Sequence, residues 1–338
     1  MSEIPPFHFK TEADSSHFLH WKEYAFPIDW AQHFGVDESA LRLNVEVGFG
    51  DGRYTVRQAL ERPQEQFVGF EIASVSVQRA LKSLQKHGIR NVRVVKLGAE
   101  FALRHLFPEH SLQSIVVNFP DPWPKERHEG NRLLQTQFFE LASTRLLEQG
   151  DIRLATDHLE YLAFARAQAQ ASQLYDLVSA TAPEAVFETK YALKWKSQGK
   201  PLFYQIFRRH GRSEKAFPPL ERSIAMPHAI FKGALPEKIP FHKQVLDYGE
   251  GHVVLHEAMQ SWSADTGGRI LVRATSDEPK FKQQLLVVIK ERKENELLVL
   301  FERFGDPIIT PTSRGAIHAT VEWLRGNGTD LELVKRDY

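Results

Sequence analysis

The stretch SIVVNFPDPWPKERH, residues 114–128, joins a short apolar run to a loop rich in proline and charge. The run Ser114–Val117 is typical of a buried strand in a parallel sheet. Pro120, Pro122 and Pro124 stiffen the loop that follows, and a rigid loop after such a strand is where an α/β protein holds functional groups. A plain surface turn is the alternative, but a turn does not require Asp, Trp, Lys, Glu, Arg and His in this order.

Apolar, β-branched runs alternate with amphipathic segments on both sides of this stretch, from residue 43 to about residue 210. This alternation predicts an α/β fold with a doubly wound, mostly parallel sheet and right-handed crossovers. Ligands bind to such a sheet at the carboxyl ends of its strands. Strands are expected over residues 43–47, 66–70, 91–97, 114–118 and 151–155, and helices over 54–60, 75–87, 100–107, 132–147 and 158–172.

The composition changes after Arg209. Residues 210–219 are polar and contain prolines, which predicts a linker. Beyond it, strand-like segments with a turn at 291–296 and a final helix over 313–325 indicate a smaller α+β domain with antiparallel hairpins. The expected strands are 252–258, 268–276, 284–291 and 296–303. We therefore expect an N-terminal segment over 1–40 that packs on the main domain, the main domain over 41–212, and a linker with an accessory C-terminal domain over 213–338.

The charge of the whole chain indicates no class of partner, because 43 basic and 43 acidic residues give 338 residues a net charge of zero. Any electrostatic surface for nucleic acid must be local. Two clusters of basic residues meet this condition. One consists of Lys125, Arg127, His128 and Arg132, and the other of Lys190, Lys194, Lys196, Lys200, Arg208, Arg209 and Arg212.

The sequence contains no cysteine, which excludes disulfides, thiolate nucleophiles, iron–sulfur clusters and cysteine-ligated zinc. The histidines, among them His105 and His110, show no metal-ligand spacing, so no metal is expected. Neither a signal-peptide pattern nor an apolar run of membrane-spanning length is present. We expect a cytoplasmic protein without membrane contact.

A glycine-rich loop, EVGFGDG at residues 46–52, lies between the first expected strand and a helix. Gly48 and Gly50 would let the backbone approach a ligand closely, although a tight turn uses glycine as well. Arg53 stands where a dinucleotide-binding loop needs a small residue, which disfavours a nicotinamide cofactor. Glu71, at the end of the next strand, is placed to accept hydrogen bonds from ribose hydroxyls.

Glu46 lies inside an apolar strand, and a carboxylate there requires a partner such as a backbone amide, an amino group or a sulfonium. A nucleoside cofactor that carries positive charge and no pyrophosphate fits Glu46, Glu71 and the glycines together. S-adenosylmethionine is such a molecule.

With these residues in view, the chain resembles the bacterial tRNA (guanine-N7-)-methyltransferases over about residues 15 to 210. The resemblance is carried by EVGFGDG at 46–52, NFPDPWPKERH at 118–128 and TKYALKWKSQG at 189–199, and the middle block is the most specific. It implies a Rossmann-like, class I S-adenosylmethionine-dependent methyltransferase fold. It also implies methyl transfer to N7 of a guanine in the variable loop of tRNA, guanine-46 in the usual tRNA numbering. The oligomeric state stays open between monomer and homodimer.

The resemblance assigns cofactor contacts to Glu46, Glu71 and Asp121, with the nucleotide end near Gly98 and Ala99. Asn118 of the middle block is expected on the cofactor side with Gly48 and Gly50. Asp121 is implied to be catalytic. The substrate contacts implied by the resemblance are Lys125, Asp157, Thr189 and Tyr191, and Arg127 and His128 are interpreted as phosphate contacts.

Methylation of guanine N7 needs no prior deprotonation, because the lone pair lies exposed in the base plane. The demands are alignment and stabilisation of developing charge, for which Asp121 is suited. Asp157 is expected to accept hydrogen bonds from the guanine N1–H and exocyclic amine, and a helix N-cap is its alternative role. Trp123 either stacks on a base or wedges the loop against the sheet, and the second is favoured.

Two positions depart from the family pattern, Gly98 where Asp is usual and Ala192 where Glu is usual. They keep open an RNA- or nucleotide-binding module that has lost catalysis. A second alternative is methylation of an exocyclic base amine, since such enzymes use an Asn/Asp-Pro-Pro-aromatic loop after the fourth strand. Phe119 and Asp121 break that pattern.

Overall fold

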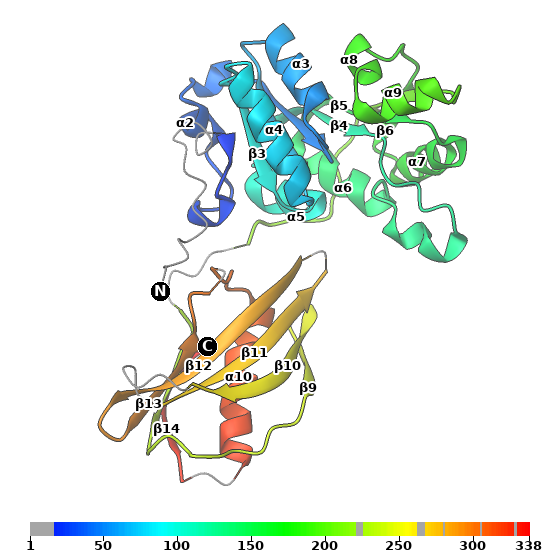
Figure 1. The fold of residues 1–338 in the computed structure, drawn as a ribbon. Coiled ribbons are helices and arrows are strands. Elements are labelled where there is room, and N and C mark those ends of the chain that lie inside the picture. The colour runs from blue at the N-terminus through cyan, green and yellow to red at the C-terminus, as the bar shows by residue number, and fades with distance from the viewer. Residues whose placement is uncertain (1–16, 221–225, 262–267, 280, 305, 328–329) are drawn as a thin grey trace. The chain divides into compact units, whose positions relative to one another are not determined.

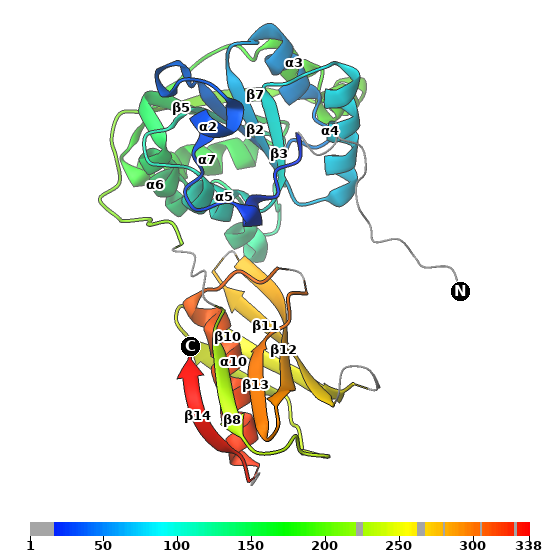
Figure 2. The same cartoon turned by 90° about the vertical axis from the view of Figure 1, so that its left-hand side faces the viewer.

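The computed structural model describes residues 17–220, 226–261, 268–279, 281–304, 306–327 and 330–338, with the backbone alone at residues 126 and 194–197. The chain divides into two compact units, Met1–Pro219 and Leu220–Tyr338 (Figures 1 and 2). The first part of the N-terminal segment expected over 1–40 lies outside the described residues.

The first unit is built on a seven-stranded sheet in the order β3-β2-β1-β4-β5-β7-β6. Neighbouring strands from β3 to β5 are parallel, and β7 runs antiparallel to both β5 and β6. The predicted doubly wound, mostly parallel sheet is confirmed. The strands are β1 (Leu43–Val47), β2 (Gln66–Glu71), β3 (Val92–Lys96), β4 (Leu112–Asn118), β5 (Leu146–Thr156), β6 (Tyr175–Val178) and β7 (Phe203–Arg209).

Two groups of helices pack on this sheet: α3 contacts α4 and α8, while α6 contacts α5 and α7 (Figure 1). The α-helices are α2 (Trp30–Phe34), α3 (Arg53–Glu61), α4 (Ser74–Lys86), α5 (Ala99–Leu106), α6 (Thr136–Arg145), α7 (Leu159–Ser172), α8 (Glu184–Phe187) and α9 (Lys190–Ser197). Short 3-10 helices are η1 (Trp21–Glu23), η2 (Glu38–Ala40) and η3 (Glu126–Asn131). The helix expected over 132–147 begins only at Thr136, because Arg132 and Leu134 turn into the interior instead of continuing a helix.

The core of this unit is densest at the central strands. Every residue of β1 is buried, and Ile115 and Val117 of β4 are almost completely inaccessible. Burying one such aliphatic side chain contributes about 1.5–3 kcal/mol. The carboxyl ends of β1 and β4 are therefore held rigidly, and the loops that follow them start from fixed points.

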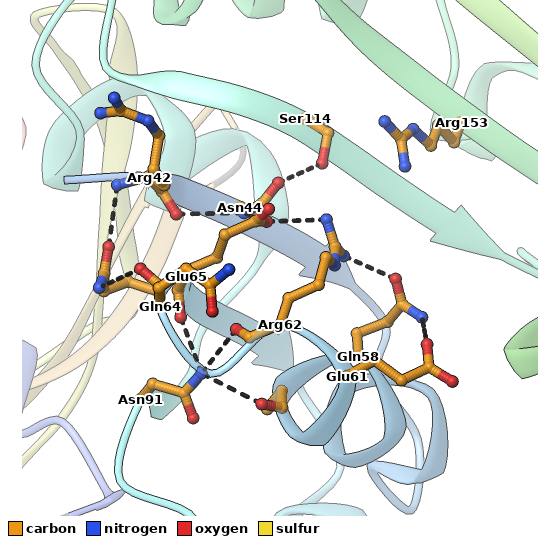
Figure 3. A network of polar contacts seen from close by, with 12 residues as sticks. Arg42, Asn44, Gln58, Glu61, Arg62, Gln64, Glu65, Asn91, Ser114 and Arg153 are labelled. Carbon is orange, nitrogen blue, oxygen red and sulfur yellow. Dashed lines mark hydrogen bonds and ion pairs between the residues drawn. The ribbon is translucent and has the colours of Figure 1, made fainter. Parts of the chain in front are cut away.

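A network of polar contacts fastens the other end of the same strands (Figure 3). Asn44 of β1 accepts a hydrogen bond from Ser114 of β4 at 2.7 Å and donates to Glu65 at 2.9 Å. Arg62, just after α3, reaches Glu65 at 2.7 Å and Gln58 at 2.6 Å. The C-terminal end of α3 is thus tied to the sheet, so its N-terminal end is fixed relative to the carboxyl ends of the strands.

Residues 210–219, predicted as a linker, pack in part on the first unit. Arg145, which is 1% exposed, donates to the carbonyl oxygen of Phe217 at 2.5 Å, and Arg104 donates to that of Pro218 at 3.2 Å. Lys215 forms an ion pair with Glu140 at 2.8 Å. Buried guanidinium groups need hydrogen-bond acceptors, and residues 211–218 supply carbonyl oxygens to Arg145 and Arg104. We call this segment the strap. It belongs to the first unit, and the chain divides after Pro219.

The second unit is a seven-stranded antiparallel sheet in the order β14-β8-β13-β12-β11-β10-β9, with α10 packed against it. This matches the smaller α+β architecture predicted for the C-terminal region. Thr310 and Ser313 form a capping box at the start of α10, two residues before the predicted helix. The elements are β8 (His228–Lys232), β9 (Gln244–Tyr248), β10 (Gly251–Gln260), β11 (Arg269–Glu278), β12 (Phe281–Lys293), β13 (Glu296–Phe301), α10 (Pro311–Gly326) and β14 (Glu332–Asp337).

Within the described parts of both units, no helix combines the length and the apolar character needed to cross a membrane.

Candidate active site

Two adjoining cavities open at the carboxyl ends of β1, β2 and β4. The larger has a volume of about 450 Å³, and the smaller, of about 60 Å³, includes Glu46 and Thr189 in its lining. Shared lining residues make them one site. The shared residues are Gly48, Gly50, Ser76, Asn118, Phe119 and Tyr191.

The loop between β1 and α3 forms one wall of this site. Gly48, Gly50 and Gly52 all have positive φ angles, of 69°, 58° and 79°. At Gly52 a side chain is excluded twice, because a Cβ atom would also lie 2.9 Å from the Cβ of Ala80. The glycines therefore serve the turn and the close packing of α3 against α4, as well as access to the cavity.

Glu71 lines the larger cavity, but its carboxylate is already bonded to the protein. It accepts hydrogen bonds from the backbone N–H groups of Gly50 at 3.1 Å, Ile72 at 2.8 Å and Ala73 at 3.0 Å. The carboxylate thus fixes the glycine loop to the end of β2. A carboxylate has about four acceptor positions, so one remains on the Oε2 side for a hydroxyl group.

Glu46 is the buried carboxyl of the site, and its two oxygens have separate partners. Thr55 of α3 donates to Oε2, and Asn118 at the end of β4 donates from Nδ2 to Oε1 at 3.0 Å. Burial raises the pKa of the Glu46 carboxyl to about 7, against the opposing effect of these hydrogen bonds. A cation bound in the cavity would stabilise the ionised form of this buried carboxyl.

Asn118 carries a buried acceptor that a ligand could satisfy. Its side-chain oxygen Oδ1 is buried without a hydrogen-bond partner, although it belongs to a residue that lines both cavities. Such an acceptor is costly to leave unsatisfied. An ammonium group bound between Glu46 and Asn118 would satisfy it, and the polar groups of Glu71 would face a ribose. The residues of the site therefore fit S-adenosylmethionine.

The proline-rich loop after β4 places Asp121 and Trp123 in the lining of the larger cavity. Phe119 and Trp123 adopt positive φ angles of 52° and 41°, which are rare for side-chain-bearing residues. Trp123 is 38% exposed and contacts the ring of His128 edge-on at 5.7 Å. It therefore lines the cavity while it packs within its own loop.

Arg132, which the sequence placed in a basic cluster for nucleic acid, has a different role. Its side chain is 5% exposed and donates to the carbonyl oxygens of Pro122 at 3.0 Å and Trp123 at 3.3 Å. The assignment to an electrostatic surface is wrong for this residue, because its guanidinium is taken up by the loop. Lys125 and Arg127 are exposed, as that assignment requires.

The third sequence block contributes Thr189 and Tyr191 to the smaller cavity. The Thr189 hydroxyl donates to the carbonyl oxygen of Val186 at 2.8 Å and accepts from the N–H of Ala192 at 3.2 Å, so it also caps α9. Tyr191 is 46% exposed and lies beside Phe119, with ring centres 6.4 Å apart. Ala192 is buried and is absent from the described residues that line the two cavities.

Asp157 is not the N-cap of α7, which was its alternative role. That position belongs to His158, whose ring nitrogen accepts from the N–H of Tyr161. The Asp157 carboxylate instead forms an ion pair with Lys200 at 3.3 Å. Its acceptors therefore remain partly available to a ligand.

The structure brings all eight predicted cofactor residues into the lining of the two cavities and leaves some predicted substrate residues outside it. Lys125, Arg127, His128 and Asp157 do not contribute to the described lining of the two cavities. The sequence reasoning missed Thr55, whose spacing of nine residues from Glu46 carries no recognisable signal. Among the lining residues that it also missed are Tyr54, Ser76, Arg79 and Phe119.

The chain is similar to known proteins over the region that contains this site. A family model described as "Putative methyltransferase" matches residues 41–205, which contain the whole site. A tRNA (guanine-N(7)-)-methyltransferase of Thermus thermophilus is 37% identical over 293 residues, covering 87% of this chain and 91% of the relative. The protein of the same name from Deinococcus radiodurans is 38% identical over 314 residues, covering 90% and 96%.

The similarity extends through the second unit as well as the first. A tRNA (guanine-N(7)-)-methyltransferase of Thermotoga maritima is 30% identical over 309 residues, covering 90% of this chain and 95% of the relative. Relatives with nearly the full length in common therefore share both units. The chain belongs to the family of bacterial tRNA (guanine-N(7)-)-methyltransferases.

Proposed function

We propose that this protein is an S-adenosylmethionine-dependent methyltransferase that acts on N7 of a guanine in tRNA, in the variable loop at guanine-46. The observation that carries the proposal is the pairing of Glu46 with Asn118, a residue that lines both cavities and whose oxygen Oδ1 is buried without a hydrogen-bond partner. Membership of the family supplies the substrate class. A tRNA substrate also supports a cytoplasmic location.

The cofactor half of the site is proposed to consist of side chains at the ends of β1, β2 and β4 and of the start of α5. Glu46 and Asn118 would hold an ammonium group, and the free acceptor position on Glu71 would receive a ribose hydroxyl. Gly98, the N-cap of α5, and Ala99, its first residue, line the larger cavity, where a contact to the nucleotide end would come from backbone groups or from Glu100. S-adenosylmethionine, when bound, supplies an electrophilic methyl group on a sulfonium.

Asp121 is proposed to be the catalytic residue, since it lines the larger cavity on a loop with fixed geometry. Guanine N7 attacks with its in-plane lone pair, so the protein has no proton to remove. Positive charge appears on the imidazole ring of the base during this attack. A preorganised carboxylate beside the ring stabilises that charge.

The substrate half of the site is proposed to consist of Asp157, Thr189 and Tyr191 around the base and of Lys125, Arg127 and His128 along the backbone. Asp157 can accept hydrogen bonds from the guanine N1–H and exocyclic amine when its ion pair with Lys200 opens. Lys125 and Arg127 are exposed and suited to phosphates. The shared location of Thr189 and Tyr191 in the smaller cavity supports their role near the base.

Replacement of Asp121 tests the catalytic assignment. Asp121→Asn keeps the shape of the side chain and removes its charge, so the rate of methyl transfer to unmodified tRNA should fall by about 10²-fold. Single-turnover transfer of labelled methyl at saturating cofactor and tRNA measures this rate. Asp176→Asn, on the exposed face of β6, is the control and should keep the wild-type rate. A wild-type rate in Asp121→Asn would remove Asp121 from catalysis.

A further inference from the structure

Arg132 is a buried cation next to the loop that carries Asp121. Its Nε donates to Pro122 O at 3.0 Å, Nη2 donates to Trp123 O at 3.3 Å, and Nη1 donates to the Glu129 carboxylate at 2.6 Å. The carbon of the guanidinium lies 4.7 Å from the centre of the Phe164 ring on α7. Each nitrogen of the group thus has a partner inside the protein, and burial withholds it from a phosphate.

The loop that Arg132 contacts is stiffened by its prolines but has few hydrogen-bond donors of its own. Pro120, Pro122 and Pro124 have no N–H group, so they cannot donate hydrogen bonds across the loop. Phe119 and Trp123 have positive φ angles, and such a conformation costs about 1–3 kcal/mol at each residue and persists only when the surrounding structure imposes it. External contacts must therefore stabilise this conformation.

Backbone hydrogen bonds support the loop only at its two ends within the described part of the chain. Phe119 donates to the carbonyl oxygen of Ala155 at 2.8 Å, and Lys125 accepts from the N–H of His128 at 2.8 Å. The carbonyl groups of Pro122 and Trp123 lie between these ends, directly after Asp121. Arg132 binds both of them, so it supports the segment that the ends leave free.

Arginine is the residue type that this contact requires. A guanidinium presents parallel donors in a rigid plane, whereas a lysine ammonium is a single point charge on a flexible stem. The face of the Arg132 guanidinium packs over the Phe164 ring, and its Nη1 is held by the Glu129 carboxylate. Glu129 is itself held, since its carbonyl oxygen accepts from Gln135 at 2.7 Å and from Arg132 N–H at 3.0 Å.

We propose that Arg132 is a positioning residue for methyl transfer, which sets the place of Asp121 by holding the carbonyl oxygens of Pro122 and Trp123. The inference rests on the proposed function, because it assigns the consequence of this contact to the catalytic step. Arg132 acts through Asp121 and does not touch the substrate. A displacement of about 1 Å in such a group lowers a rate by up to about 10²-fold, so the loss should appear in turnover.

The test compares Arg132→Lys with two other arginine-to-lysine variants. Arg132→Lys keeps the charge and loses the fork, so the single-turnover rate should fall by about 10- to 100-fold, with the tRNA dissociation constant and its salt dependence close to wild type. Arg127→Lys is exposed and proposed to contact phosphate, so its effect should fall on tRNA affinity. Arg145→Lys also loses a buried fork to carbonyl oxygens, at Leu103, Arg104 and Phe217, away from the site.

Arg145→Lys separates lost stability from lost positioning. It should lower the melting temperature while the single-turnover rate at 25 °C stays within about twofold of wild type. Glu129→Gln weakens the position of Arg132 with less risk to folding. Glu129 is about half exposed, and the substitution changes only the partner of Nη1 on the Arg132 guanidinium. It should lower the rate in the same direction as Arg132→Lys, by a smaller factor, in a protein that folds normally.

The outcomes separate this inference from the proposed function. No transfer of methyl to tRNA by the wild-type protein would overturn the proposed function itself. Transfer by the wild type with an unchanged rate in both Arg132→Lys and Glu129→Gln would overturn the positioning role alone. A loss confined to tRNA affinity, with a reduced salt dependence, would make Arg132 a phosphate contact and would equally overturn it.

Discussion

At the scale of single residues, Glu46 gives the site a definite pH dependence. Its pKa is raised to about 7 because the carboxyl is buried, and Thr55 and Asn118 are neutral donors that only partly offset this effect. Below pH 7 the carboxyl is mainly neutral in the free protein. It must lose its proton to pair with the ammonium group of the cofactor.

Cofactor binding should therefore release a proton at low pH. We expect close to one proton released per S-adenosylmethionine bound at pH 6, almost none at pH 8, and an affinity that falls up to about tenfold per pH unit below 7. Calorimetric titration in two buffers with different ionisation enthalpies measures both quantities. Glu46→Gln should bind more weakly and without proton release. Equal proton release in this variant would assign the titration to another group.

At the scale of elements, the turn from β1 into α3 depends on Gly52. Its φ angle of 79° and the 2.9 Å approach to Ala80 both oppose a side chain. Gly52→Ala should destabilise the protein by more than the roughly 1–2 kcal/mol that the left-handed conformation costs alone. Gly88→Ala is the matched control, since Gly88 has a φ angle of 62° but no atom within 4 Å of the new Cβ.

Thermal unfolding of the two variants measures this difference. The melting temperature of Gly52→Ala should lie below that of Gly88→Ala, and its affinity for S-adenosylmethionine should fall as well, because Gly50 and Gly48 belong to the same loop. If both variants have the same melting temperature, the contact between α3 and α4 at Ala80 relaxes without an energetic cost, and the close-packing argument for Gly52 is wrong.

The elements themselves were largely predictable from the sequence, and the reasons are physical. Central parallel strands such as β1 and β4 are buried on both faces, so apolar residues predominate in them, as in the run Ile115–Val117 and at Leu43, Val45 and Val47. The edge of the sheet was less visible. β6 has only four residues, two of which are exposed, and β7 runs antiparallel, so neither has such a run.

The site was predictable only where a residue type was out of place. Glu46 in an apolar strand indicated that its carboxylate has a partner, and the proline-rich loop indicated a fixed backbone geometry. The identity of the partner, Thr55, and the inward turn of Arg132 depend on how α3 and η3 fold back, which no local pattern contains. For the same reason, the strap over residues 211–218 has a linker-like composition although Arg145 holds it.

At the scale of the whole molecule, the division after Pro219 predicts how the chain tolerates truncation. A fragment of residues 1–219 keeps the first sheet, its helices and the strap, so it should fold. A fragment of residues 1–210 loses the contacts of Phe217 with Arg145 and of Lys215 with Glu140, and leaves a buried guanidinium partly unpaired. It should melt at a lower temperature than the longer fragment.

Thermal unfolding followed by circular dichroism compares the two fragments. In the full-length protein, Arg104→Gln removes one hydrogen bond to the strap. It should lower the melting temperature, but by less than the difference between the two fragments. Equal melting temperatures for the two fragments would show that residues 211–219 are a linker after all.

The central claim concerns the atom that is methylated, and chemical mapping of the product tests it most directly. Unmodified tRNA is incubated with the protein and S-adenosylmethionine, then treated with borohydride and aniline, which cleave the chain only at N7-methylguanosine. We predict cleavage at a single guanosine in the variable loop, absent without protein or cofactor. Incorporation of methyl groups without cleavage would contradict the account and point to an exocyclic amine instead.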